Sequence, residues 1–163
     1  MQLDLRKIID NPGASTDFQC EIGTDRLDFP SVSGYIRNPE AHGRVFNEAG
    51  ILRLTGSVTA EMICVCDRCG EEFKSVKTTA LDVVLSAEES DENPELFLIE
   101  GDSVDLDEVV ATCLILDMET KFLCKEDCKG LCPTCGKNLN FGACACRKQP
   151  DPRFAVLEQL LDK

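Results

Sequence analysis

Residues 51–70 have the sequence ILRLTGSVTAEMICVCDRCG, which decides the fold of the chain. From Leu52 to Cys66 every even-numbered residue is apolar or glycine, whereas the odd-numbered residues from Arg53 to Glu61 are polar. A period of two is typical of a half-buried β-strand, because successive side chains of a strand point to opposite faces of its sheet. The stretch therefore predicts one long strand with a buried, even-numbered face.

The residues after this strand predict that it forms half of a hairpin. Asp67-Arg68-Cys69-Gly70 is a turn, and residues 73–86 are expected to return as the antiparallel partner strand. Shorter strands are expected at residues 18–22, 32–37 and 43–47 before the hairpin, and at residues 96–99 after it. Together these segments indicate an antiparallel meander over residues 18–87.

The spacing of apolar residues changes to that of a helix after residue 105. Residues 105–122 are predicted to form a helix that packs on the sheet, with Ser103 or Asp105 as its N-cap. Asp151-Pro152 is typical of the start of a last short helix, since Pro suits the first helical position. We therefore predict an α+β fold, with an antiparallel β-sheet meander, a packing helix, a C-terminal Cys-rich zinc-binding tail and a short terminal helix. We expect an α+β domain at 1–123 and a zinc-knuckle tail with the terminal helix at 124–163.

The composition argues against several classes of protein. The chain has 163 residues, of which 43% are hydrophobic, so it can build a core. No apolar run approaches the roughly 20 residues of a membrane span, and the N-terminus lacks the apolar region of a secretory signal, so we expect a cytoplasmic protein without a membrane partner. His42 is the only histidine and is expected in a surface turn. Nucleotide-binding glycine loops are absent, so we expect neither an enzyme nor a small-molecule substrate.

The net charge of −13 comes from one part of the chain. Residues 78–120 contain 13 acidic residues and no Lys or Arg. Such a segment is either a solvated surface that favours solubility or a patch that binds a basic partner, such as a ribosomal protein. It would repel nucleic acid, whereas residues 121–163 carry a net charge of +3 and could approach phosphate.

Eleven cysteines are the most unusual feature of the composition. In a reducing compartment, clustered thiols are more often metal ligands than disulfides. Six of the eleven fall within residues 124–146, which have the sequence CKEDCKGLCPTCGKNLNFGACAC. This segment has too few apolar residues to fold by packing alone, so metal binding is expected to supply its folding energy.

The segment Cys132-Pro133-Thr134-Cys135-Gly136 has the form of a zinc knuckle, in which two cysteines turn their sulfurs toward one metal. Tetrahedral zinc needs two further ligands, which either the upstream pair or the downstream pair of tail cysteines could supply. We predict one zinc ion held by four of the six tail cysteines, which are Cys124, Cys128, Cys132, Cys135, Cys144 and Cys146.

A second group of cysteines lies at the predicted tip of the hairpin. Cys66 and Cys69 also have the CxxC spacing of a knuckle, and they could pair with Cys132 and Cys135 to make a ribbon with a long insertion. They could equally form a redox pair, with Arg68 lowering the pKa of a thiolate.

The remaining three cysteines are not assigned to a metal. Cys64 shares the buried parity of its strand and is expected in the core, where a free thiol behaves as a small hydrophobe. Cys113 lies on the apolar stripe of the predicted helix and is also expected in the core. Cys20 has no assigned role.

Several features follow one another in a recognisable order. They are CDRCG at 66–70, an acidic segment leading to a helix, CKGLCPTCGKNLN at 128–140, and DPRF at 151–154 with a Leu-rich end. In this order they resemble the bacterial and plastid YceD-like family, the large-subunit (23S) ribosomal RNA accumulation proteins. The resemblance covers most of the chain, and CKGLCPTCGKNLN is its specific part. It implies a non-enzymatic factor needed for normal levels of large-subunit ribosomal RNA, whose gene commonly neighbours that of a zinc-ribbon ribosomal protein.

We therefore expect an accessory factor for ribosomal RNA accumulation or large-subunit assembly. Its expected partner is a ribosomal protein or a pre-ribosomal particle, with ribosomal RNA as a further candidate. Two alternatives remain: a thiol redox or metal-responsive protein that uses Cys66 and Cys69, and a zinc-ribbon regulator that binds nucleic acid. Metal content and thiol titration separate the first alternative from the accessory factor, and a preference for RNA over duplex DNA separates the second.

Overall fold

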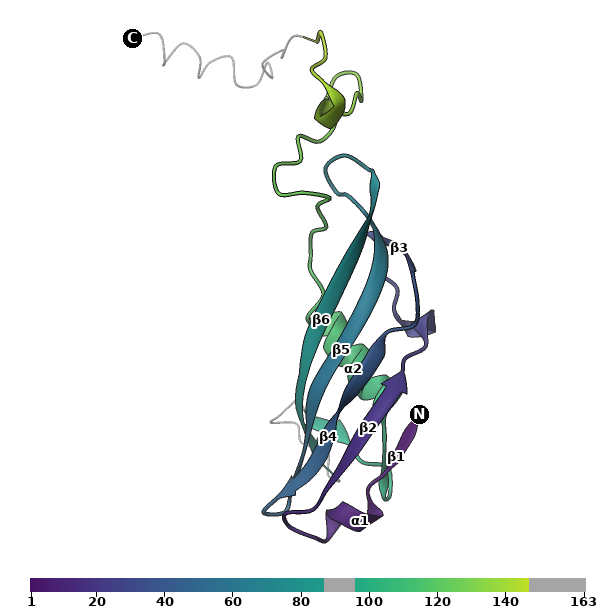
Figure 1. The fold of residues 1–163 in the computed structure, drawn as a ribbon, viewed down its shortest axis with the longest axis vertical. Coiled ribbons are helices and arrows are strands. Elements are labelled where there is room, and N and C mark those ends of the chain that lie inside the picture. Colours follow the sequence, from purple (N-terminus) through teal and green to yellow (C-terminus); the bar gives the residue numbers. More distant parts are fainter. Residues whose placement is uncertain (87–95, 147–163) are drawn as a thin grey trace, which may run out of the picture.

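The computed structural model describes residues 1–86 and 96–146 of the chain (Figure 1). The short helix predicted after Asp151 lies outside these described residues. Within them, no helix is long and apolar enough to cross a membrane.

The longest elements are two strands of fifteen residues, β5 (Ile51–Val65) and β6 (Glu72–Ser86), which form an antiparallel hairpin. The hairpin predicted from the sequence is confirmed, because its strands begin and end within about one residue of the predicted positions. The even-numbered side chains of β5 form the buried face as expected, and those at most 5% exposed include Leu52, Leu54, Val58, Ala60, Met62 and Cys64.

Four shorter strands extend the sheet on both sides of the hairpin. β4 (Glu40–Glu48) pairs with the first half of β5, β2 (Ser15–Glu21) pairs with β4, and β3 (Val32–Tyr35) pairs with β5 near the hairpin tip. β7 (Leu96–Leu98) pairs with the end of β6 and runs parallel to it. The sequence predicted these segments as strands in an antiparallel sheet. It did not predict the direction of β7, because side chains alternate in the same way in parallel and antiparallel strands.

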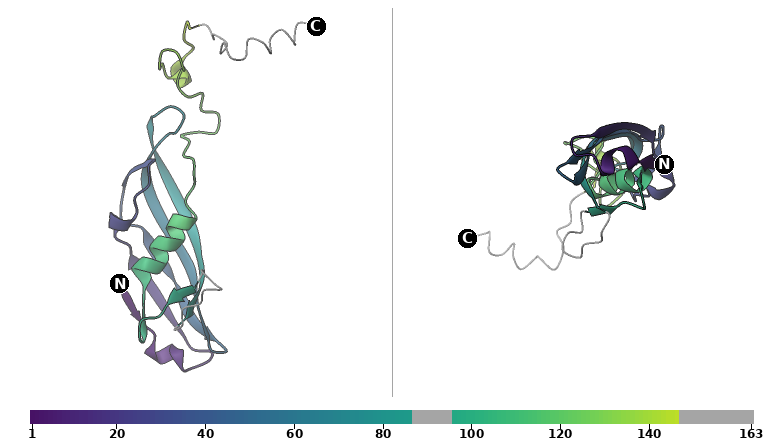
Figure 2. Two further views of the ribbon diagram at one scale, coloured as in Figure 1. Left: turned by 180° about the vertical axis from the view of Figure 1, so that it is seen from behind. Right: turned by 90° about the horizontal axis from the view of Figure 1, so that it is seen from below.

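The helix α2 (Leu106–Leu116) covers one face of the sheet (Figure 2). Its N-cap is Asp105, whose side chain accepts a hydrogen bond of 3.0 Å from the Asp107 N–H. The side chains that it buries against the sheet are Leu106, Val109, Val110, Ala111 and Leu114.

The helix ends earlier than the predicted residue 122, because the chain is held on β6 at the next residue. The Asp117 carboxylate accepts a hydrogen bond of 2.8 Å from the Thr79 hydroxyl and lies 3.1 Å from the Lys77 ammonium group. From Asp117 the chain runs toward the hairpin tip. Along this segment the Phe122 side chain is only 5% exposed and packs into the hydrophobic core.

The N-terminus closes the other end of the core. β1 (Gln2–Asp4) pairs with β8 (Ser103–Asp105) just before α2, and the short helix α1 (Arg6–Ile9) buries Ile8. The buried Asn47 side chain holds α1 in place, because its amide donates to the carbonyls of the last two residues of the helix at 2.8 and 2.7 Å. Neither a strand at residues 2–4 nor a helix at residues 6–9 was predicted.

The sheet face opposite α2 is polar. Arg44 and Asp17 form an ion pair across β4 and β2, and Arg53 and Asp82 form another across β5 and β6. Solvent screens exposed pairs of this kind, so they contribute little to the stability of the sheet. His42 is exposed, as predicted, but it lies in the strand β4 rather than in a turn.

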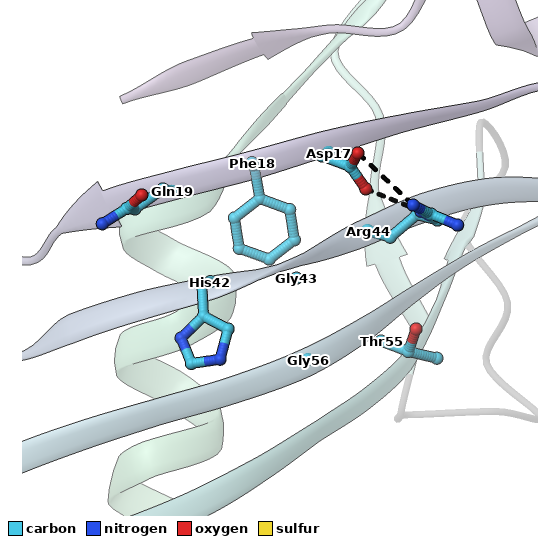
Figure 3. A pocket seen from close by; sticks show the side chains of 8 residues that line it. All are labelled: Asp17, Phe18, Gln19, His42, Gly43, Arg44, Thr55 and Gly56. Atoms are coloured by element: carbon cyan, nitrogen blue, oxygen red, sulfur yellow. Dashed lines mark hydrogen bonds and ion pairs between the residues drawn. The ribbon is translucent and has the colours of Figure 1, made fainter.

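Two glycines allow β4 and β5 to approach closely beneath this polar face. Gly43 lies opposite Gly56, and a Cβ on Gly56 would come within 2.3 Å of the His42 carbonyl oxygen. The Phe18 ring lies beside Gly43, and a Cβ there would come within 2.9 Å of Phe18 Cζ (Figure 3). The result is a hollow open to solvent, lined by Asp17, Phe18, Gln19, His42, Gly43, Arg44, Thr55 and Gly56.

This close approach predicts that Gly56→Ala destabilises the sheet. The added methyl group would meet backbone that cannot rotate away, so the strands must separate, at a cost of about 1–3 kcal/mol. Urea unfolding measures the loss. Gly34→Ala is the matched control, because nothing lies within 4 Å of a Cβ at Gly34. Equal stability of the two variants would contradict the packing argument.

Candidate metal centres

The first group of cysteines joins the hairpin tip to the segment after α2, and we call it the hairpin cluster. It consists of Cys66, Cys69, Cys124 and Cys128, whose four sulfurs lie within 4.8 Å of one another. Cys66 Sγ is 3.8 Å from Cys128 Sγ, and Cys69 Sγ is 3.7 Å from Cys124 Sγ. All but Cys124 are buried, so the cluster is largely closed to solvent.

The second group, which we call the tail cluster, lies beyond the hairpin tip (Figure 1). It consists of Cys132, Cys135, Cys144 and Cys146, and its four sulfurs also lie within 4.8 Å of one another. Cys144 Sγ is 3.4 Å from Cys132 Sγ. Cys135 and Cys146 are exposed, so this cluster is more open than the first.

Each cluster is built on the same turn. In the hairpin, the Gly70 N–H donates to the Cys66 carbonyl at 2.8 Å, and Gly70 has a φ of +72°. In the tail, the Gly136 N–H donates to the Cys132 carbonyl at 2.9 Å, and Gly136 also has a φ of +72°. A positive φ favours glycine, which explains why both CxxC pairs are followed by Gly. The knuckle geometry predicted for the two CxxC segments is therefore present in both.

The tail cluster has one of the two predicted groupings, in which the downstream pair of tail cysteines completes the Cys132 knuckle. The sequence did not predict the second cluster, in which the upstream pair, Cys124 and Cys128, is completed by Cys66 and Cys69. Cys66 and Cys69 lie with Cys124 and Cys128, not with the Cys132 knuckle. The CxxCG motif occurs twice in the sequence, and eight cysteines are enough for two sites with four ligands each. These two signals could have indicated two separate clusters. Metal binding by these residues stays a prediction.

Both clusters fit a tetrahedral metal. Four sulfurs at about 2.3 Å from one ion lie about 3.8 Å from each other, close to the distances of 3.7 and 3.8 Å in the hairpin cluster. A disulfide would bring two sulfurs to about 2.05 Å, whereas all eleven cysteines are free thiols.

Backbone N–H groups favour the thiolate of Cys132 in the tail cluster and that of Cys66 in the hairpin cluster. In the tail cluster, the N–H groups of Cys135 and Thr134 lower the pKa of Cys132 to about 6. In the hairpin cluster, burial opposes ionisation of Cys66, but N–H groups led by that of Cys124 outweigh it and lower the pKa of Cys66 to about 6.

Burial and the crowding of sulfurs raise the pKa of other thiols in the two clusters. Burial, followed by the neighbouring sulfur of Cys128, raises the pKa of Cys124 to about 12. The neighbouring sulfur of Cys135 raises the pKa of Cys146 to about 12. Four thiolates cannot share such a small space without a compensating positive charge. A bound divalent cation supplies that charge and deprotonates its thiol ligands, so the donor set suits a metal.

The guanidinium of Arg68 holds the backbone around the hairpin cluster, and only the backbone N–H of Arg68, not its charged side chain, helps to lower the pKa of Cys66. The guanidinium donates to the carbonyls of Cys128 at 3.0 Å and Glu126 at 3.3 Å. The Arg68 carbonyl accepts a hydrogen bond of 3.1 Å from the Leu131 N–H. Gly130 has a φ of +69°, and a Cβ there would lie 2.9 Å from the Arg68 carbonyl oxygen. The segment between the two clusters is therefore packed tightly on the hairpin tip.

Asp67 positions the chain just before the first tail cysteine. Its carboxylate accepts hydrogen bonds from the Ser31 hydroxyl at 2.7 Å and from the Phe122 N–H at 2.6 Å. These two donors, the Ser31 hydroxyl first, lower the pKa of Asp67. The backbone is thus held at Phe122, two residues before Cys124, and this places Cys124 next to the hairpin knuckle.

The other three cysteines lie outside both clusters. Cys64 is fully buried in the core, as predicted, and Cys113 packs against the core from α2. Cys20, which had no assigned role, is a core residue on β2. Burial raises the pKa of all three thiols.

Comparison with known proteins places the part of the chain that carries both clusters in one family. Residues 54–161 match the family described as "Large ribosomal RNA subunit accumulation protein YceD". The chain belongs to this family. The match runs from β5 through both cysteine clusters, so it includes the features on which the resemblance to YceD proteins was recognised.

Two relatives of the YceD chain illustrate its similarity to curated proteins. An uncharacterized protein of Mycobacterium tuberculosis and one of Mycobacterium bovis are each 29% identical to it over 117 residues. The aligned region covers 69% of this chain and 56% of each relative, so the chain spans about half the length of the curated relatives it matches. No solved structure matches the chain.

Proposed function

We propose that this YceD protein is a non-enzymatic accessory factor for the accumulation of 23S ribosomal RNA, acting in the cytoplasm by binding during large-subunit assembly. The observation that carries the proposal is the family match over residues 54–161. That match links the chain to the large ribosomal subunit, and the role in binding is our extension of it.

Each cysteine cluster, in this proposal, binds one zinc ion. Sets of four thiolates in a tetrahedron select zinc or iron–sulfur centres among common biological metals. Zinc supplies no redox chemistry here and acts as a fold-stabilising crosslink, because its binding energy becomes folding energy in a segment with little apolar surface. Hydrophobic packing contributes little to the stability of the described part of the tail, since Phe141 is 78% exposed and Leu131 is 45% exposed.

The zinc proposal predicts about two zinc ions per purified chain. Cys66→Ser and Cys132→Ser should each reduce the content to about one, because each removes a ligand from a different cluster. Elemental analysis of the reduced protein measures this. Cys113→Ser is the matched control and should keep two zinc ions, since Cys113 lies in neither cluster. Absence of transition metal would refute the proposal, and iron would indicate a cluster of another kind.

The tip that carries both clusters is our candidate for the partner-binding end. It lies at one end of a long molecule, away from the core under α2 (Figures 1 and 2). In the described part of the acidic segment, several carboxylates already have local cations: Asp82 pairs with Arg53, Asp117 with Lys77, and Asp105 with the N-terminal amine.

The charge at the tip favours a protein partner over direct contact with RNA. A zinc ion with four thiolates carries a formal charge of −2, so two such centres offset the nearby lysines. Lys137 donates to the Ala143 carbonyl at 2.9 Å and is partly engaged within the tail. The exposed Leu131 and Phe141 side chains supply apolar contact area of the kind found at protein interfaces.

Co-purification from the native host tests the function. We expect the tagged chain to sediment with large-subunit precursors, and its depletion to lower the ratio of 23S to 16S ribosomal RNA. Phe141→Ala should weaken the association while the zinc content is kept. Ile51→Ala, which removes a side chain 57% exposed at the opposite end of β5, should not. Free sedimentation of the chain and an unchanged RNA ratio after depletion would refute the proposal.

A further inference from the structure

A hydrogen bond connects the two cysteine clusters. Asn140 lies in the loop of the tail cluster, between Cys135 and Cys144, yet its side-chain amide donates to Cys128 Sγ of the hairpin cluster at 3.3 Å. Asn140 is therefore placed by one cluster and contacts a sulfur of the other.

The orientation of the Asn140 amide is fixed by its other contacts. Its Oδ1 accepts a hydrogen bond of 2.9 Å from the Lys129 N–H, so its Nδ2 must face the sulfur of Cys128. The same Nδ2 donates to Asn138 Oδ1 at 2.9 Å, and the Asn140 N–H donates to that oxygen at 3.0 Å. These contacts hold the amide in the orientation that reaches the sulfur.

The loop that carries Asn140 is docked on the segment between the clusters. The Leu139 N–H donates to the Gly130 carbonyl at 2.9 Å, and Leu131 and Asn138 form an isolated β-bridge. The two ends of the loop are Cys135 and Cys144, which belong to the tail cluster. Closing that cluster around a metal shortens the free loop and reduces the number of positions that Asn140 can take.

We propose that Asn140 is a positioning residue that couples the two metal centres, so that metal in the tail cluster strengthens metal binding by the hairpin cluster. This inference rests on the proposed zinc sites and deepens them. Hydrogen bonds from neighbouring groups to a metal ligand typically change metal affinity by about 10–100-fold. By thermodynamic linkage, metal in the hairpin cluster strengthens binding in the tail cluster by the same factor.

The test measures the zinc affinity of each cluster separately. Zinc-loaded protein is titrated with a chelator, and free thiols are then alkylated and mapped by mass spectrometry of peptides. Protection of Cys66 and Cys69 reports the hairpin cluster, and protection of Cys132 and Cys135 reports the tail cluster.

Asn140→Ala should release zinc from the hairpin cluster at about tenfold lower chelator activity, because the N–H donor to Cys128 is lost. Asn140→Asp should weaken the hairpin cluster at least as much, since it keeps an acceptor for the Lys129 N–H but has no donor for the sulfur. Phe141→Ala, in the same loop, should leave the hairpin cluster unchanged.

Cys135→Ser tests the coupling from the other side. It removes a ligand of the tail cluster and should weaken the hairpin cluster by a similar factor, and adding Asn140→Ala to it should weaken the hairpin cluster no further. Wild-type affinity of the hairpin cluster in Asn140→Ala or Asn140→Asp would overturn the proposal. So would additive losses in the double variant. Failure of ribosome association with these zinc affinities intact would refute only the proposed function.

Discussion

The pairing of β5 with β6 is the constraint on which the rest of the molecule depends. The register is unbroken from Leu52 to Val65. The even-numbered side chains that face the core in the middle of β5 therefore stay on the same face as far as the turn. This alternation places the Cys66 side chain on the inner face of the hairpin tip. The chain that follows α2 packs against the same face. A shift of one residue would turn every side chain of the strand to the opposite face and remove Cys66 from the cluster. The metal-binding geometry therefore depends on the packing of aliphatic side chains far from the sulfurs.

The sequence predicted what is local in this fold. Alternation in residues 52–66 gave the hairpin, its buried face and the core position of Cys64, because these depend only on neighbours along the chain. The end of α2 was missed, since Asp117 is held by Thr79 and Lys77, which are distant in sequence. The pairing of the N-terminus with residues 103–105 was missed for the same reason.

The grouping of the cysteines shows the same limit. Both knuckles could be recognised, because CxxCG specifies a local turn with a positive φ at its glycine. The pair of cysteines that completes each knuckle depends on the position of the chain after α2. The hydrogen bond from the Phe122 N–H to Asp67 fixes this position. Arg68 and Asn140 could not be assigned from the sequence, because their roles arise only once the two turns lie against each other. A search for motifs finds the ligands and leaves out the residues that orient them.

The cysteines of the hairpin cluster are far apart in the sequence, and this delays the completion of the cluster during synthesis. Cys66 and Cys128 are 62 positions apart, so a growing chain exposes its first knuckle well before the residues that complete the cluster have been made. Translation proceeds at about 5–20 residues per second, so this knuckle waits for several seconds with only half of its ligands. The tail knuckle waits far less, because its ligands span only residues 132–146. Cys124 and Cys128 thus complete a turn that was made long before them, and the hairpin tip matures only after residue 128 has left the ribosome.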